Sequence, residues 1–172
     1  TTPSETKIFH IGSIALIDGE DANLWEQKFL ELAEQGVVTS LDPNIRELLV
    51  KNKKQYLDRL GRMSKHANIL KLSDEDLNYM RPEASLGDAF NEICSNIEAE
   101  IIVLTMGAKG ARVKAGEISF EVSAAVCNPL VDTVGAGDTF MGTILAEIHE
   151  KKASAAALSA ITKDELIQII ER

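Results

Sequence analysis

The sequence predicts an α/β fold in which helices flank a mostly parallel sheet. Short apolar runs rich in Ile, Val and Leu alternate along the chain with longer amphipathic stretches, and cap or turn residues separate them. This alternation is typical of strand–helix units around a parallel sheet. With 172 residues, 45% of them hydrophobic, the chain is long enough to bury a core. We therefore expect residues 1–172 to belong to one domain.

The first half of the chain begins with a strand that ends at Gly12. Gly36 ends the next helix, and after the second strand Asp42 and Pro43 begin a helical segment that reaches Leu49. The predicted strands are residues 8–11, 37–41 and 68–72, and the predicted helices are residues 23–35, about 52–66, and 73–80.

The second half contains a further helix, a strongly apolar strand and a hairpin that turns at Gly116. An irregular stretch, residues 124–134, precedes a long helix. Thr162 and Glu165 form a capping box that opens a last helix. The predicted strands are residues 100–105, 111–114 and 118–122, and the predicted helices are residues 86–97, 138–151 and 162–170.

Composition argues against several classes of protein. The formal net charge of −9 disfavours a general binder of nucleic acids or anionic membranes, because those partners select basic surfaces. The basic stretch at residues 51–65 is expected to be a solvated helix face. Apolar runs such as residues 101–104 are too short to cross a bilayer, and two cysteines without a secretory segment favour reduced thiols in the cytoplasm. The histidines His10, His66 and His149 lack metal-ligand spacing and are expected to be structural or surface residues.

A glycine-rich turn with acidic flanks precedes the long helix near the end of the chain. Residues 132–138 read Asp-Thr-Val-Gly-Ala-Gly-Asp. Gly135 and Gly137 allow close approach of a ligand to the backbone, and the free amides at the helix start favour a phosphate. Asp138 would then lie beside that phosphate as a proton acceptor, although the same residues also suit an ordinary helix cap. Phe140 excludes a dinucleotide fingerprint, and no Gly-Lys-Ser/Thr follows as a P-loop requires.

This turn resembles the second signature of the ribokinase and fructokinase family, the PfkB-type sugar kinases. The resemblance implies that Asp138 is the catalytic base and that the amides of Gly135, Ala136 and Gly137 form an anion hole for the transferring phosphoryl group.

A second turn follows the apolar strand that ends near Thr105. By itself it reads as a tight turn into a hairpin, at a sheet edge where open α/β folds bind ligands. It is similar to the family's Thr-x-Gly-x-x-Gly turn, which contacts nucleotide phosphates and ribose. The resemblance implies nucleotide-binding roles for Thr105, Gly107, Lys109 and Gly110.

Ser73 and Asp76 are close to a capping box at the start of a short helix. They stand where the family has Asn-x-x-Glu, whose acid organises Mg²⁺ and phosphates. The resemblance implies that Ser73 lies at the nucleotide and that Asp76 positions Mg²⁺ through water. The match is imperfect, since Asp is shorter than Glu and Ser is not an amide.

The segment Asp42-Pro43-Asn44-Ile45-Arg46 is an ordinary strand–turn–helix entry, yet it resembles the Asp-Pro-Asn-x-Arg segment of fructokinases. That likeness implies that Asn44 and Arg46 face the phosphates or the sugar. Residues 9–16 also resemble fructokinases more than ribokinases, which favours a hexose substrate. Asp132 alone suits a turn, but the resemblance implies that it and the carbonyl of Val134 contribute to a site for a monovalent cation such as K⁺.

The resemblance spans nearly all of the chain but implies only the nucleotide-binding half of a ribokinase-like domain, without the N-terminal strands and the β lid. An exposed sheet edge makes self-association or a dimer possible. The implied function is an ATP-dependent sugar kinase with fructose favoured, ATP as cosubstrate, Mg²⁺ as cofactor and small-molecule partners. Two alternatives stay open: a catalytically silent nucleotide-binding or protein-interaction module, and a different substrate such as ribose, a nucleoside or 2-keto-3-deoxygluconate.

Overall fold

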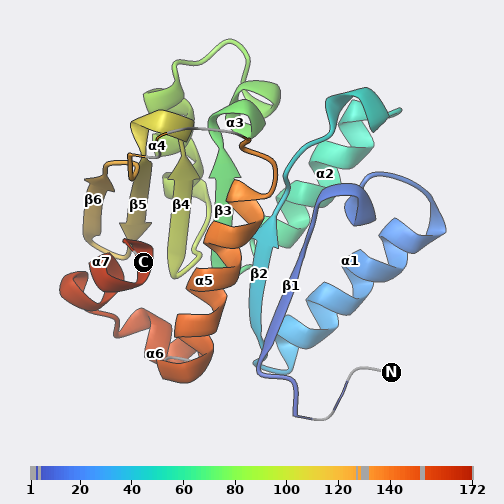
Figure 1. Cartoon of the computed structure of the whole chain (residues 1–172). Coiled ribbons are helices and arrows are strands. Elements are labelled where there is room, and N and C mark those ends of the chain that lie inside the picture. Colours follow the sequence, from blue (N-terminus) through green and yellow to red (C-terminus); the bar gives the residue numbers. More distant parts are fainter. Residues whose placement is uncertain (1–2, 4, 127, 129–131, 152–153, 172) are drawn as a thin grey trace.

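The computed structural model describes residues 3, 5–126, 128, 132–151 and 154–171. Within these ranges, six strands form one sheet in the order in which they occur along the chain (Figure 1). The first four strands are parallel, and the last two pair antiparallel, which confirms the predicted mostly parallel sheet. The strands are β1 (Ile8–Gly12), β2 (Val38–Asp42), β3 (Ile69–Ser73), β4 (Ile101–Thr105), β5 (Ala111–Ala115) and β6 (Ile118–Val122).

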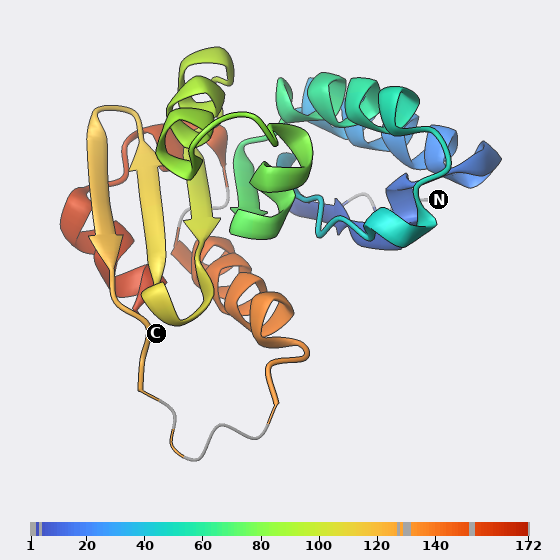
Figure 2. The same ribbon diagram turned by 90° about the horizontal axis from the view of Figure 1, so that it is seen from above.

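Helices cover both faces of the sheet, and Figures 1 and 2 show the three layers. One face carries α1 (Gly19–Glu34), α2 (Lys53–Ser64), α3 (Asp74–Met80) and α4 (Leu86–Asn96), and the opposite face carries α5 (Ala136–Lys151), α6 (Ala155–Ser159) and α7 (Lys163–Ile170). Short 3₁₀ helices lie between these elements: η1 (Ser13–Leu16), η2 (Glu47–Leu49) and η3 (Gly107–Lys109).

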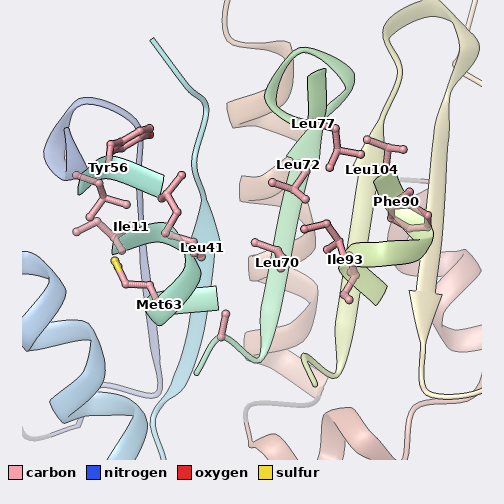
Figure 3. Packing of buried hydrophobic residues seen from close by; sticks show 14 of the residues in the cluster. Ile11, Leu41, Tyr56, Met63, Leu70, Leu72, Leu77, Phe90, Ile93 and Leu104 are labelled. Carbon is pink, nitrogen blue, oxygen red and sulfur yellow. The ribbon is translucent and has the colours of Figure 1, made fainter. Parts of the chain in front are cut away.

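Alternating side chains of each strand enter two separate cores. On β3, Leu70 and Leu72 pack toward α2, α3 and α4, in the cluster shown in Figure 3. Ile69, one residue away, packs on the other face with residues of α5 and α7 such as Ile144 and Ile169. Burial on both faces explains why these strands read as nearly continuous apolar runs.

The structure corrects several of the predicted elements. The helical segment expected from Asp42 to Leu49 is only the 3₁₀ helix η2, because Asp42 still belongs to β2 and residues 43–46 are not helical. Helix α1 begins at Gly19 instead of residue 23, because Glu20 and Asp21 lie favourably in its first turn. Helix α6 was not predicted; Ser154 caps it through the amide of Ala157, and its five residues are too few for a periodic signal. Helix α5 begins at Ala136, two residues before the predicted start at residue 138, so Asp138 lies within its first turn. Both predicted capping boxes are confirmed.

A buried arginine joins the segment after β1 to α1 and α2. Arg59, only 2% exposed, donates hydrogen bonds to the carbonyl of Leu16 at 2.7 Å and to the carboxylate of Glu26 at 3.2 Å. Arg62 also pairs with Glu26, at 2.6 Å. Because η1 leads out of β1, this network holds the loop that follows the first strand.

Protonation of Glu26 should destabilise the protein. Burial alone would raise the pKa of Glu26, but hydrogen bonds and charges from Arg62 and Arg59 lower it below its ordinary value of 4.5. A carboxyl with a lowered folded-state pKa stabilises the fold above its unfolded-state pKa, and this contribution is lost as the pH falls through the folded-state pKa. Urea unfolding of the Glu26→Gln variant should therefore show a smaller loss of stability on acidification than the wild type. A matched Glu34→Gln variant, changed at an exposed site of the same helix, should keep the wild-type pH dependence; equal curves for all three proteins would contradict the prediction.

In the described part of the chain, none of the helices has the length and apolar character that a membrane span requires.

Candidate functional site

The strand face that packs against α5 changes from apolar to polar toward the carboxyl ends of the strands. Along β2, Val38 on this face belongs to the core, whereas Ser40 and Asp42 follow it at alternate positions. His10 of β1 pairs in register with Ser40, and its Nδ1 lies 3.0 Å from the Ser40 hydroxyl. Lys71 of β3 follows Ile69 on the same face. Carboxyl ends of parallel strands are the usual ligand-binding edge of such folds.

Asp138, the predicted base, and Asn44, which the resemblance implied faces the phosphates or the sugar, lie together at this edge. Both line a cavity of about 430 Å³ at the ends of β1 and β2. The Asp138 side chain is exposed, so a ligand in the cavity can reach its carboxylate. Arg46 is also exposed, but it is not among the described residues that line this cavity. The lining residues are Phe9, His10, Ile11, Gly12, Ser13, Ala15, Trp25, Asp42, Asn44 and Asp138.

The amino end of α5 offers free backbone donors beside Asp138. Gly135 adopts a φ of 79° in the turn, and its carbonyl accepts the first helical hydrogen bond, from the amide of Thr139 at 2.8 Å. Among the described residues, no acceptor pairs with the amides of Gly137 and Asp138. Free amides and the positive end of the helix dipole together suit an anion.

A buried ion pair lies below this turn. The Lys71 ammonium is 2.9 and 3.1 Å from the two carboxylate oxygens of Asp42, and both side chains are 5% exposed. Burial raises the pKa of Asp42 above its ordinary value, while the charge and hydrogen bond of Lys71 oppose the rise. Burial also disfavours the charged form of His10, which lowers its pKa below the ordinary value, and the negative charge of Asp138 opposes that change.

Sequence reasoning missed His10, Asp42 and Lys71 as members of the site. His10 was taken as a structural or surface residue and Asp42 as a helix cap. The sequence could have indicated a role for Lys71, because it interrupts the apolar run Ile-Leu-Lys-Leu. A lysine in a buried strand needs a charged or polar partner.

Asp76 holds the loop that carries Asn44. Its two carboxylate oxygens accept hydrogen bonds from the backbone amides of Ile45, at 2.7 Å, and Ser73, at 2.8 Å. The residue is 2% exposed, and Asn44 before Ile45 has a φ of 40°. The Asp76 carboxylate thus fastens the turn after β2 to the end of β3.

Replacing Asp76 with asparagine should destabilise the protein by about 1–3 kcal/mol, because an amide nitrogen would face one of the two backbone donors and leave it unsatisfied. Glu75→Gln is the matched control, since Glu75 carries the same charge in the same helix turn but is exposed. Urea unfolding of the two variants at neutral pH measures the difference. Equal stability of both variants would contradict this role of Asp76.

The residues predicted to bind nucleotide lie farther along the same edge. Ser73 ends β3 and pairs in register with Thr105 at the end of β4. Gly107 and Lys109 form η3, and both are exposed; Gly110 then leads into β5. These residues line one edge of the sheet with Asp138, although they lie outside the cavity that contains it.

Asp132 and Val134 lie together on the outer side of the glycine turn. One oxygen of Asp132 accepts the amide of Val134 at 2.9 Å, and both residues line a second cavity of about 420 Å³ with Gly135, Ala136 and Thr139. In the part of the chain described, no group of three or more His, Cys, Asp or Glu residues could hold a metal ion.

Known proteins resemble this chain in sequence and in fold. Residues 2–160 match the pfkB family of carbohydrate kinases. A fructokinase of Rhizobium leguminosarum bv. trifolii is 35% identical over 144 residues, which cover 84% of this chain and 43% of that protein. A putative fructokinase-8 of Arabidopsis thaliana is 29% identical over 154 residues, 87% of this chain and 70% of that protein.

Solved structures of known proteins are also similar to this chain in fold. A double mutant of Vibrio cholerae O395 fructokinase, with fructose, ADP and potassium bound, has a TM-score of 0.82 at 26% identity and is matched over 98% of this chain and 53% of its own. A Xylella fastidiosa fructokinase with bound ATP has a TM-score of 0.83 at 23% identity, over 95% and 51% of the two chains. The chain thus has a ribokinase-like fold and spans about half the length of these solved structures. Because the family match covers most of its length, the chain belongs to the pfkB family of carbohydrate kinases.

Proposed function

We propose that this chain carries the phosphoryl-transfer site of an ATP-dependent fructokinase. One observation carries the proposal: the Asp138 carboxylate and the free amides of Gly137 and Asp138 meet at the amino end of α5, beside a cavity large enough for a sugar. A proton acceptor and an anion site next to each other are what transfer of a phosphoryl group to a hydroxyl requires.

In the proposed reaction, a sugar hydroxyl lies in the cavity beside Asp138. Its oxygen forms a bond to the γ-phosphorus of ATP, the bond between that phosphorus and the bridging oxygen of ADP breaks, and the hydroxyl proton passes to Asp138. The amides of Gly135, Ala136 and Gly137 form the proposed anion hole for the transferring group, although the Ala136 amide already donates to the Thr133 carbonyl at 3.1 Å. Preorganised donors of this kind stabilise developing charge without reorganisation.

The nucleotide is proposed to lie along the ends of β3 and β4. Ser73, Thr105 and the turn from Gly107 to Gly110 supply backbone and hydroxyl groups there, and the exposed Lys109 supplies a positive charge. This arrangement puts the γ-phosphate toward α5 and the rest of the nucleotide toward β5.

Mg²⁺ is proposed to neutralise charge on the ATP phosphates. Asp76 uses both oxygens for backbone amides and is nearly inaccessible, so an ion held mainly by phosphates and water fits these residues better than one bound directly by the protein. A role of Asp76 at that ion would act through water. Asp132 and the Val134 carbonyl are the proposed ligands for a monovalent cation such as K⁺, which is present in the Vibrio cholerae complex.

Fructose is the proposed substrate because the relatives just described are named fructokinases and Asn44 reaches the cavity. The Salmonella enterica aminoimidazole riboside kinase has the same fold, with a TM-score of 0.78, so the fold alone does not select the sugar.

The test is ADP release by the full-length protein with ATP and excess Mg²⁺, supplied in turn with fructose, ribose, a nucleoside and 2-keto-3-deoxygluconate. We expect turnover with fructose and its loss when EDTA removes Mg²⁺. Faster turnover with another substrate would overturn the fructose assignment. ATP binding by calorimetry without turnover on any substrate would favour the nucleotide-binding module.

A further inference from the structure

We propose that Lys71 is a positioning residue for phosphoryl transfer, which holds the amino end of α5 in place and keeps Asp42 from repelling the transferred group. This inference rests on the proposed function, because it assigns a role within the same site.

Lys71 is placed where an apolar residue would be expected. It lies in the middle of β3, between two buried leucines, and is 4% exposed. Removing an ammonium from water is costly, and apolar residues of similar volume often stabilise such a position equally well or better. On the same face of the sheet, Val38, Ile69 and Val103 are apolar. The Lys71–Asp42 pair lies under the glycine turn, toward the carboxyl ends of β2 and β3.

The Lys71 ammonium packs directly against the glycine turn. A Cβ atom added at position 137 would lie 3.2 Å from the Lys71 Nζ, closer than an ordinary contact. The absence of a side chain at Gly137 therefore lets the ammonium approach the backbone whose amide is proposed to bind the phosphoryl group. The Asp42 carboxylate fixes the ammonium from the other side.

The charge of Lys71 also matters for the ligand. Asp42 lines the same cavity as Asp138, and the charges of Asp76 and Asp138 both act on it. Without Lys71, a phosphoryl group at the end of α5 would face the carboxylates of Asp42 and Asp138 without the cation that pairs with Asp42. Like charges at short range in a partly buried site repel strongly. Pairing with Lys71 therefore lowers the repulsion between Asp42 and an anion bound at this edge of the sheet.

The test compares four variants of the full-length protein. Lys71→Met removes the charge and leaves Asp42 unpaired, so it can lose stability for that reason alone. The double variant Lys71→Met/Asp42→Asn removes both charges at similar volume and avoids a stranded carboxylate. Lys54→Met is the control, because it breaks an exposed pair with Asp58 in which Lys54 is 86% exposed. Asp138→Asn removes the proposed base but leaves the pair intact.

Two measurements are made on each variant: kcat and KM for fructose, and the affinities for ATP and ADP by calorimetry. We expect the double variant to lose roughly 10- to 100-fold in kcat, because small displacements of reacting groups have effects of that size. Its KM for fructose should stay near the wild-type value, and its preference for ATP over ADP should fall, since only ATP places a phosphate at the turn. Lys54→Met should match the wild type, and Asp138→Asn should keep the preference for ATP.

A double variant with wild-type kcat and wild-type preference for ATP would overturn the inference while leaving the proposed function intact. If the wild type phosphorylates none of the sugars, the proposed function fails. The positioning role of Lys71 is then judged from the ATP and ADP affinities alone. A preference for ATP that depends on Lys71 supports the positioning role at the turn, whereas equal affinities in the wild type overturn it. Thermal unfolding of the double variant close to that of the wild type shows that any change in these ratios is not a loss of fold.

Discussion

Replacing Asp138 with asparagine should lower kcat for sugar phosphorylation by roughly 10²- to 10⁴-fold, the range expected when a general base is removed. Asparagine keeps the size of the side chain but cannot accept the hydroxyl proton. ATP binding should persist, because the amides of the α5 amino end and the pair below them are unchanged. Steady-state kinetics with fructose, together with calorimetry for ATP, measures both effects.

Asp164→Asn is the matched control for this prediction. Asp164 is also an exposed acid in the first turn of a helix, α7, so its replacement repeats the change in helix-dipole interaction without touching the cavity. The control should keep wild-type kinetics. A wild-type rate in Asp138→Asn would contradict the assignment and direct attention to His10 and Asp42, the other titratable residues that line the cavity.

Replacing Gly110 with alanine should destabilise the protein by about 2–5 kcal/mol, from backbone strain and overpacking together. Gly110 has a φ of 95°, and an added Cβ would lie 1.9 Å from the carbonyl oxygen of Val122, in the neighbouring strand β6. Relief requires β6 to move away or the turn after β4 to open. Because that turn is proposed to bind nucleotide, affinity for ATP should fall as well. Urea unfolding and calorimetry measure the two effects.

The Gly116→Ala variant separates the cost of backbone strain from the cost of a steric clash. Gly116 turns the β5–β6 hairpin with a φ of 52°, but nothing lies within 4 Å of its added Cβ. It should lose only about 1–2 kcal/mol, the cost of a left-handed backbone for an ordinary residue, and ATP affinity should not change. Equal losses in the two variants would show that the contact with Val122 is relieved without cost.

Local signals in the sequence were sufficient for most of the secondary structure. The strands β1 to β6 lie within two residues of their predicted ends, because each is an apolar run that begins and ends at turn residues. The capping boxes at Ser73 and Thr162 were correct for the same reason, since a cap depends on two side chains three residues apart. The start of α1 was missed because its first turn is mostly polar, and the short α6 was missed because five residues are too few to establish a period.

The site was predictable only where one segment supplies it. The glycine turn and Asp138 are neighbours in sequence, so their position at a helix start followed from spacing. Asn44 was placed at the correct sheet edge through its resemblance to known fructokinases. His10, Asp42 and Lys71 come from three different strands, and no spacing along the chain relates them. The Asp76 side chain could be identified as a cap, but its second bond, to the amide of Ile45, joins two loops that only the fold brings together.

By itself, the sequence determined the order and type of most elements, and it placed the glycine turn of residues 135–137 at a helix start with a carboxylate beside it. These follow from backbone freedom, apolar periodicity and helix-end donors, all of which act over a few residues. The tertiary structure alone decided what lies under that turn. Pairing of β1, β2 and β3 in parallel register puts polar residues of all three strands on the face beneath α5, and the burial there forces Lys71 and Asp42 to pair. That pairing depends on strand order and on exclusion of water, neither of which is a local property of the chain.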